Sequence, residues 1–75
     1  MNIFIIFDIK FKPNQEKIEK ILKHTGLNKI QTNTYTGNLD KNQLNTIKTQ
    51  LKETIKQKDK IIILPLVKNR FTIQT

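Results

Sequence analysis

The chain has 75 residues, of which 14 are lysine or arginine and six are aspartate or glutamate, and its formal net charge at pH 7 is +8. A chain of this length makes one domain, residues 1–75, which would be only marginally stable as a monomer. It has no cysteine and one histidine, His24, so disulfides and zinc centres built from these residues are excluded, and a partner chain is expected to stabilise it instead.

The first expected element is a strand over residues 1–9, which are rich in β-branched and aromatic side chains. Its apolar run, Ile3 to Phe7, stops at Asp8, so it is too short for the apolar core of a signal peptide and far too short to span a bilayer. Together with the absence of cysteine, this favours a cytoplasmic protein that does not associate with membranes.

The segment after this strand carries the signals of a helix and then of two short strands. Pro13 and Asn14 open the helix, with Asn14 as its N-cap, and Gly26 is a natural residue to follow its end. Residues 27–37 suit strand structure, but no tight two-residue turn marks where one strand becomes the next, so a broken hairpin is expected.

The C-terminal half repeats the pattern of a helix followed by a strand. Asp40 and Gln43 resemble a capping box, and the apolar stripe that follows predicts a second helix running to about Gln57. A continuous apolar strand, residues 61–64, comes next, and Pro65 either ends this strand or confines it to a sheet edge. Residues 71–73 are expected to add a last short strand.

The order of these elements predicts an α+β fold, a ferredoxin-like βαββαβ sandwich with a short terminal strand and both helices on one face of an antiparallel sheet. The strands at 3–7 and 61–64 are apolar at every position, however, and helices on one face cannot bury side chains on the other. The simplest cover for the second face is an identical subunit, so the chain is expected to dimerise through that face. The alternative is a monomer with a few exposed apolar side chains.

Asp8 is the residue for which the sequence most favours a catalytic role. The chain has no serine or cysteine nucleophile, and Asp8 is a carboxylate that ends an apolar strand, where ligand-contacting groups are common. One carboxylate makes a poor metal site, but a two-fold dimer supplies Asp8 from both subunits to one Mg²⁺ or another divalent cation such as Mn²⁺. The ion would activate water for phosphodiester cleavage. The alternative is that Asp8 starts a turn and bonds to the local backbone.

The basic residues predict a polyanion as partner. All but Arg70 are lysines, whose point charges suit phosphates better than base edges, so binding of RNA or DNA without sequence preference is expected. On the second helix, three lysines recur at helical spacing. The candidate contacts are Lys10, Lys12, Lys17, Lys20, Lys48, Lys52 and Lys56. The alternative is a solvated lysine surface that binds nothing.

Four short sequence motifs are spread over nearly the whole chain. Residues 3–9 form a strand that ends in an aromatic residue and an aspartate, and residues 18–26 form a helix that closes on glycine. Residues 30–39 include Gln-x-Asn-Thr-Tyr-x-Gly-x-Leu, and residues 61–66 are a strand with a Pro-Leu ending. In this order and spacing they resemble the small CRISPR-associated endonuclease family that forms the second subunit of the spacer-acquisition complex.

This resemblance implies a ferredoxin-like homodimer in which paired copies of Asp8 hold one divalent metal ion, with nuclease activity on RNA or DNA. It also implies a CRISPR integrase as partner, with the small dimer bridging integrase dimers along the prespacer duplex, a role that needs no catalysis. Asn33 stands where the family has serine and joins the candidate nucleic-acid contacts, while Asn14 and Gln15 stand where family members often carry arginine. The alternatives are a non-catalytic DNA-binding scaffold and a stand-alone, toxin-like ribonuclease of related fold.

Overall fold

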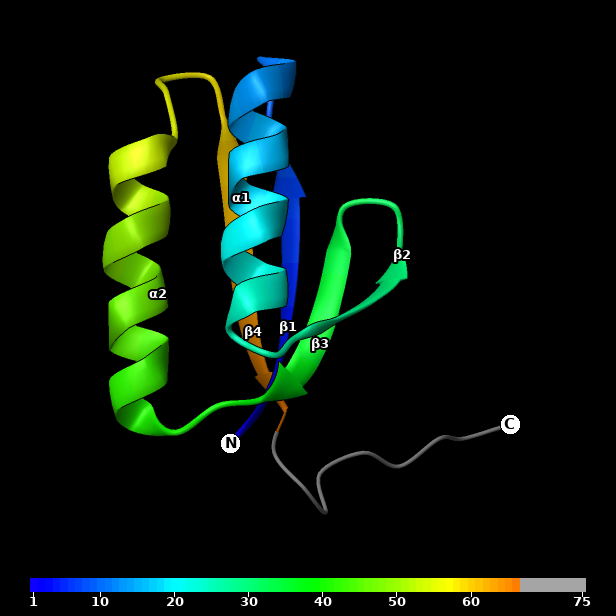
Figure 1. Ribbon diagram of the computed structural model, residues 1–75, viewed down its shortest axis with the longest axis vertical. Helices are drawn as coiled ribbons and strands as arrows, with labels where there is room; N and C mark the ends of the chain where they lie inside the picture. Colours follow the sequence, from blue (N-terminus) through cyan, green and yellow to red (C-terminus); the bar gives the residue numbers. More distant parts are fainter. Residues whose placement is uncertain (67–75) are drawn as a thin grey trace.

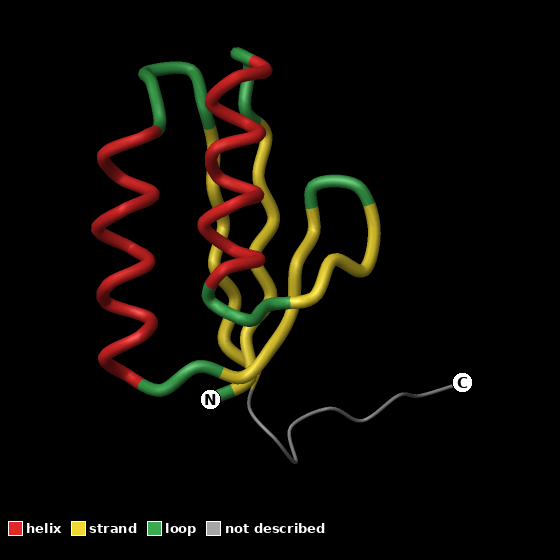
Figure 2. The backbone as a smooth tube through the Cα atoms, viewed as in Figure 1, coloured by secondary structure: helices red, strands yellow, loops and turns green. Residues whose placement is uncertain are grey.

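The structure, a computed structural model, describes residues 1–66. Along them the chain forms β1 (Asn2–Asp8), α1 (Lys12–His24), β2 (Asn28–Gln31), β3 (Thr34–Asn38), α2 (Lys41–Thr54) and β4 (Lys60–Leu66). Figure 2 shows the two helices side by side over the strands. This order confirms the predicted α+β, ferredoxin-like fold, whereas the strand expected at residues 71–73 lies outside the described residues. Neither of the two described helices is long and apolar enough to cross a membrane.

The four described strands form one antiparallel sheet in the order β2-β3-β1-β4. α1 and α2 cover the same face of this sheet (Figure 1). β1 pairs with β4 along its whole length, from Asn2 opposite Leu66 to Asp8 opposite Lys60. Pro65 therefore lies within an edge strand of the described sheet, where a residue without a backbone N–H is tolerated. This is the second of the two predicted alternatives, because β4 continues past Pro65 rather than ending there.

The core lies between the sheet and the helices. β1 contributes every second side chain to it, because side chains alternate between the two faces of a sheet. Ile3, Ile5 and Phe7 point toward the helices and are at most 3% exposed. Tyr35 of β3 is also buried, with its ring centroid 6.1 Å from that of Phe7. The helices contribute buried aliphatic side chains at helical spacing, which are Ile18, Leu22, Ile47 and Leu51. Burying each such side chain contributes about 1.5–3 kcal/mol, so the helix-facing side of the sheet stabilises the single chain.

The opposite face of the sheet, the open face, carries the other residues of the same strands. We call Phe4, Ile6, Ile62 and Leu64 the apolar strip, because the pairing of β1 with β4 sets Phe4 opposite Leu64 and Ile6 opposite Ile62. Ile6, Ile62 and Leu64 are 37%, 51% and 44% exposed. The apolar second face that the sequence predicted is therefore present, and dimerisation through it stays a prediction.

The start of α1 differs from the prediction. The helix begins at Lys12, and Phe11 is its N-cap, with an extended backbone and no side-chain hydrogen bond to the helix, so the assignment of Asn14 as N-cap is wrong. Pro13 explains the earlier start, because proline is well suited to the first turn, where its missing N–H would have no helical partner.

Two other predicted helix signals are confirmed. Gly26 follows α1 with a φ of +98°, a left-handed conformation that glycine adopts without strain, and the Leu27 N–H donates back to the Leu22 carbonyl at 3.1 Å. At the start of α2, Asp40 Oδ1 accepts from the Gln43 N–H at 2.7 Å, and Gln43 Oε1 accepts from the Asp40 N–H at 3.0 Å. This is the predicted capping box.

The end of α2 is earlier than predicted. The helix stops at Thr54 rather than near Gln57, and Ile55 already has an extended backbone. The next N–H, that of Lys56, donates to Asp59 Oδ2 at 2.7 Å. An aspartate side chain in the following loop thus takes a backbone donor that a longer helix would have used.

The hairpin is tighter than predicted. Gln31 pairs with Thr34, so Thr32 and Asn33 form a two-residue turn, and the expectation of a broken hairpin without a tight turn is wrong. Asn33 adopts a left-handed φ of +62°, which asparagine tolerates better than most residues. The irregularity expected in this segment is instead a register shift within β2, between Lys29 and Gln31.

Candidate functional site

Asp8 lies at the C-terminal end of β1, on the open face, two residues beyond Ile6 of the apolar strip. Its side chain is 62% exposed, and Oδ2 lies 3.0 Å from Lys10 Nζ. Within residues 1–66 the carboxylate accepts this side-chain hydrogen bond and none from the backbone, which argues against a purely local turn role. An exposed ion pair of this kind contributes at most about 1 kcal/mol, so a divalent cation would displace Lys10 from Asp8, and a phosphate would draw Lys10 away from it.

The carboxylate of Asp8 is a suitable ligand for a divalent cation, but one chain supplies too few such ligands to hold the ion. Carboxylate oxygens are ligands that Mg²⁺ and Mn²⁺ prefer, and Asp8 presents its oxygens to solvent. Among residues 1–66, however, no three histidine, cysteine, aspartate or glutamate side chains gather closely enough to hold a metal ion. One chain therefore supplies one carboxylate, and a metal site requires ligands from a second copy, from substrate or from water.

The loops at this end of the molecule form a basic tip, which we define as residues 9–12 and 55–60. The carboxylate of Asp59 ties the two loops together, because Oδ1 accepts from the Lys10 N–H at 2.9 Å and Oδ2 accepts from the Lys56 N–H at 2.7 Å. These backbone donors, that of Lys10 first, hold the pKa of Asp59 below its usual value. The exposed lysines of the tip are Lys10, Lys12, Lys56, Lys58 and Lys60.

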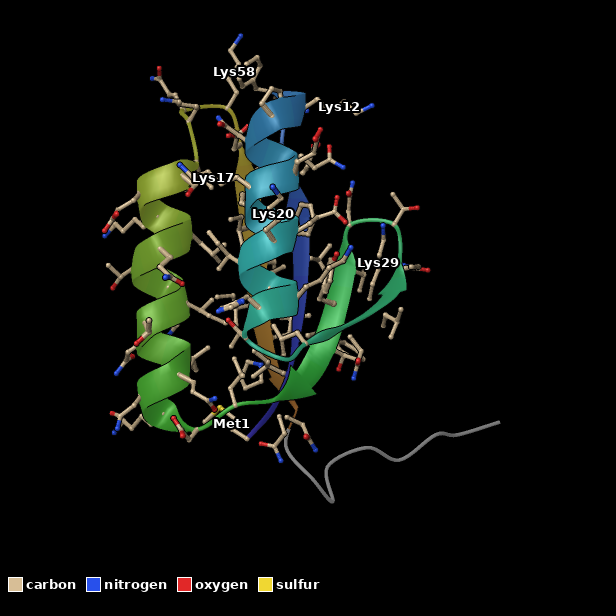
Figure 3. The ribbon with its side chains drawn as sticks, viewed as in Figure 1. Met1, Lys12, Lys17, Lys20, Lys29 and Lys58 are labelled. Atoms are coloured by element: carbon tan, nitrogen blue, oxygen red, sulfur yellow. The ribbon has the colours of Figure 1, made fainter. Side chains whose placement is uncertain are left out.

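Figure 3 shows Lys12 and Lys58 at the same end of the molecule, although they come from different loops. Lys60 is also close to the site, because the pairing of β1 with β4 places it directly opposite Asp8. Sequence reasoning did not include Lys58 and Lys60 among the candidate contacts. These two lysines could have been included if the antiparallel pairing of β1 with β4 had been predicted, because that pairing brings the start of β4 next to the end of β1.

The other predicted basic contacts lie elsewhere. Lys17 and Lys20 border two shallow hollows between α1 and α2, of about 360 and 280 Å³. Lys48 and Lys52 border a separate groove of about 180 Å³ between α2 and β4. The predicted row on the second helix loses its last member, because Lys56 follows the end of α2. The structure thus brings Lys10 beside Asp8, places Lys12 and Lys56 in the same tip, and distributes the other predicted lysines over two further surfaces.

Asn33 occupies a structural junction close to Asp8. Its carbonyl accepts from the Phe7 N–H at 3.1 Å, and its side-chain Oδ1 accepts from Gln15 Nε2 at 3.2 Å. It therefore fixes the β1 backbone directly before Asp8 and links the hairpin turn to α1. The predicted contact of Asn33 with nucleic acid stays a prediction.

A second polar junction holds the hairpin against α1. The Tyr35 hydroxyl donates to Glu19 Oε1 at 2.8 Å, and Lys29 Nζ lies 3.2 Å from the same oxygen. Burial and the hydrogen bond with Glu19 raise the pKa of Tyr35 to about 12, and the Tyr35 hydroxyl lowers the pKa of Glu19. Since both groups keep one protonation state near neutral pH, this junction positions the hairpin rather than transferring protons.

Solved structures of other proteins share the fold of this chain. The chain aligns with the crystal structure of a Cas2 protein with a TM-score of 0.83 at 25% sequence identity, covering 100% of this chain and 84% of that one. Two structures at lower identity show the fold alone. The hypothetical protein TT1823 from Thermus thermophilus has a TM-score of 0.83 at 17% identity, covering 99% of this chain and 90% of that one. Streptococcus pyogenes Cas2 has a TM-score of 0.73 at 19% identity, with 100% of both chains covered.

A family model connects the sequence directly to these proteins. No curated protein sequence is significantly similar to the chain. The family model described as CRISPR associated protein Cas2, however, matches residues 1–73, which is nearly the whole chain. The chain therefore belongs to the CRISPR-associated Cas2 family, and its function is CRISPR-associated.

Proposed function

We propose that this protein is a metal-dependent endonuclease of CRISPR spacer acquisition, which hydrolyses phosphodiester bonds in RNA or DNA as a homodimer. The observation that carries the proposal is the position of Asp8, an exposed carboxylate at the end of β1, beside the apolar strip and among the tip lysines. Family membership favours this CRISPR setting over a stand-alone, toxin-like ribonuclease.

The apolar strip supports the homodimer. Its exposed side chains lie in cross-strand pairs on β1 and β4, so they form one continuous surface rather than isolated apolar residues. A second copy related by a two-fold axis would cover the strip with an identical strip. Asp8 lies about 7 Å along the strand from Ile6, at the margin of this surface, so pairing of the open faces would bring two copies of Asp8 toward each other.

The paired Asp8 carboxylates would hold one Mg²⁺, or another divalent cation such as Mn²⁺. When bound, such an ion activates water and neutralises charge on the phosphate. The chain itself supplies positive charge at this site, because Lys10 lies beside Asp8 and Lys60 lies opposite it on β4. Both ammonium groups would attract the phosphate backbone and offset its charge without reading base identity.

The charge distribution supports nucleic acid and a CRISPR integrase as partners, in the cytoplasm and away from membranes. A net charge of +8 on 75 residues creates a strong positive field, and the tip gathers five lysines, of which Lys10 and Lys60 lie beside Asp8. A prespacer duplex bound together with the integrase is the assembly that this field and family membership favour.

A non-catalytic scaffold that binds DNA is the second candidate. It is favoured by the lysines away from Asp8, since Lys17 and Lys20 border the hollows between the helices and Lys48 and Lys52 the groove beside β4. Contacts so widely spread suit a long duplex more than a single scissile bond.

The test separates the two candidates by comparing cleavage with binding. Purified protein should cut RNA or DNA oligonucleotides when Mg²⁺ is present, and cleavage should disappear with a chelator or with Asp8→Asn. Because Asp8 is exposed, this variant should keep the fold, the dimer and the affinity for nucleic acid, measured by circular dichroism, sedimentation and fluorescence anisotropy. Cleavage that persists in Asp8→Asn contradicts the nuclease proposal, and salt-sensitive binding without any cleavage supports the scaffold.

A further inference from the structure

Phe11 is the most exposed of the large apolar side chains in residues 1–66, at 59%. It lies outside the core and outside the apolar strip, in the connection between β1 and α1, where it is the N-cap residue. Aromatic side chains usually bury most of their large apolar area. A phenyl ring exposed between Lys10 and Lys12 therefore suits a ligand that combines flat apolar surfaces with negative charge.

The backbone that carries this ring is held on both sides. Before it, the Lys10 N–H donates to Asp59 Oδ1 at 2.9 Å. At Phe11 itself, the carbonyl accepts from the N–H groups of Asn14 and Gln15 at 3.0 and 3.1 Å. The ring is thus presented from a fixed support, so a ligand that stacks on it orders only the side chain and loses little affinity to backbone entropy.

The tip provides the matching charge. Lys10, Lys56 and Lys58 come from the β1–α1 and α2–β4 connections, and Lys12 and Lys60 are the first residues of α1 and β4. Figure 3 shows Lys12 and Lys58 at the same end of the molecule, and Phe11 directly precedes Lys12. Exposed aromatic rings among lysines are the features by which proteins hold single-stranded nucleic acid, because bases stack on the rings while phosphates meet the ammonium groups. In a duplex the bases already stack on one another and are not available to such a ring.

We propose that Phe11 is a base-stacking residue, whose ring holds an unpaired base of the strand that the basic tip binds. This inference rests on the proposed function and adds a residue that contacts its substrate. Phe11 follows Asp8 by three positions, so their Cα atoms are at most about 11 Å apart. A base on Phe11 and a phosphate beside Asp8 can therefore belong to the same short stretch of strand.

The chain allows a direct optical test, because it contains no tryptophan. Phe11→Trp introduces a single indole at the proposed platform, and oligo(dT) should quench its fluorescence as the bases stack on it. Ile30→Trp is the matched control, because Ile30 is 53% exposed on β2 and the proposal gives it no contact. Both titrations contain a chelator, so that binding is measured without cleavage. An unquenched Phe11→Trp variant, under conditions where anisotropy shows the oligonucleotide bound, overturns the proposal.

Affinity gives an independent readout. Phe11→Ala should weaken binding of oligo(dT) by about fivefold or more, as the loss of one stacked base predicts, while binding of a duplex of equal length changes by less than about twofold. Equal losses for both ligands, or no loss for either, overturn the proposal. A Phe11→Ala variant that changes the monomer–dimer equilibrium instead assigns the ring to a subunit contact and likewise overturns it.

The two proposals can fail separately. If Phe11→Trp is quenched and Phe11→Ala loses single-strand affinity, but the unmodified protein never cleaves with Mg²⁺, the stacking residue stands and the nuclease proposal fails. If Phe11→Ala cuts and binds single strands as well as the unmodified protein does, the nuclease stands and Phe11 has no role in it.

Discussion

Removing the Tyr35 hydroxyl tests the junction that fixes the hairpin, and with it Asn33 and the end of β1. Tyr35 is fully buried, and its hydroxyl donates to Glu19 Oε1 at 2.8 Å. The Glu19 side chain is 18% exposed and keeps Lys29 at 3.2 Å, so Tyr35→Phe leaves the carboxylate with one partner. A hydrogen bond to a charged group contributes about 1.5–3 kcal/mol, and we expect Tyr35→Phe to lower the free energy of unfolding by about 2 kcal/mol.

The assay is urea denaturation at a fixed protein concentration, because any dimerisation makes stability depend on concentration. The urea midpoint should fall while the slope of the transition stays unchanged, and the thermal midpoint should drop by about 10 °C. Glu19→Gln is the matched partner for a double-mutant cycle. In that background the additional cost of Tyr35→Phe should be clearly smaller, because the charged acceptor is gone.

The pH dependence gives the same junction a second signature. Folding lowers the pKa of Glu19 below its ordinary value of 4.5, so the stability this contributes is present above that pH and is lost as pH falls through the folded value. The pKa of Tyr35 is raised from 10.0 to about 12, so the stability this contributes is present below pH 10 and is lost as pH rises toward 12. Tyr35→Phe should abolish the alkaline loss. A cost below about 0.5 kcal/mol, or an alkaline loss that Tyr35→Phe retains, would refute this account of the junction.

Two further predictions concern the surfaces. Ile62→Lys should raise the dimer dissociation constant about a hundredfold or more in sedimentation equilibrium, because two-fold symmetry places the buried charge in the interface twice, whereas Ile30→Lys on β2 should leave it unchanged. A dimer that survives Ile62→Lys would remove the apolar strip from the interface. Lys58→Gln at the tip should reduce the slope of log affinity against log salt for a single-stranded oligonucleotide by about 0.7, and Lys41→Gln at the opposite end of α2 should not. Equal slopes for both variants would show that the tip is not the phosphate contact.

Much of the fold could be predicted because its signals are local. The β-branched and aromatic run from Ile3 to Phe7, the capping box of Asp40 and the glycine at position 26 are each recognised from nearby residues, and the structure confirms the strand, the cap and the helix end that they predict. The turn at Asn33 escaped prediction because asparagine adopts the left-handed conformation without the glycine that usually marks a tight hairpin.

The candidate site was only partly predictable, because its parts come from distant segments. Asp8 stood out as a charge at the end of an apolar strand, but the nearness of Lys60 depends on β1 pairing with β4. The early end of α2 depends on Asp59, whose carboxylate takes the Lys56 N–H and also joins the two tip loops. No local pattern around these residues encodes that bridge.

The central claim is that two copies of Asp8 hold one divalent cation across the dimer axis. Titration with Mn²⁺, followed by electron paramagnetic resonance, tests it most directly, because the method counts bound ions per chain. The account predicts one Mn²⁺ per two chains, with binding lost in Asp8→Asn and strongly weakened in the dissociated Ile62→Lys protein. One ion per chain, or binding that Asp8→Asn leaves unchanged, would contradict it.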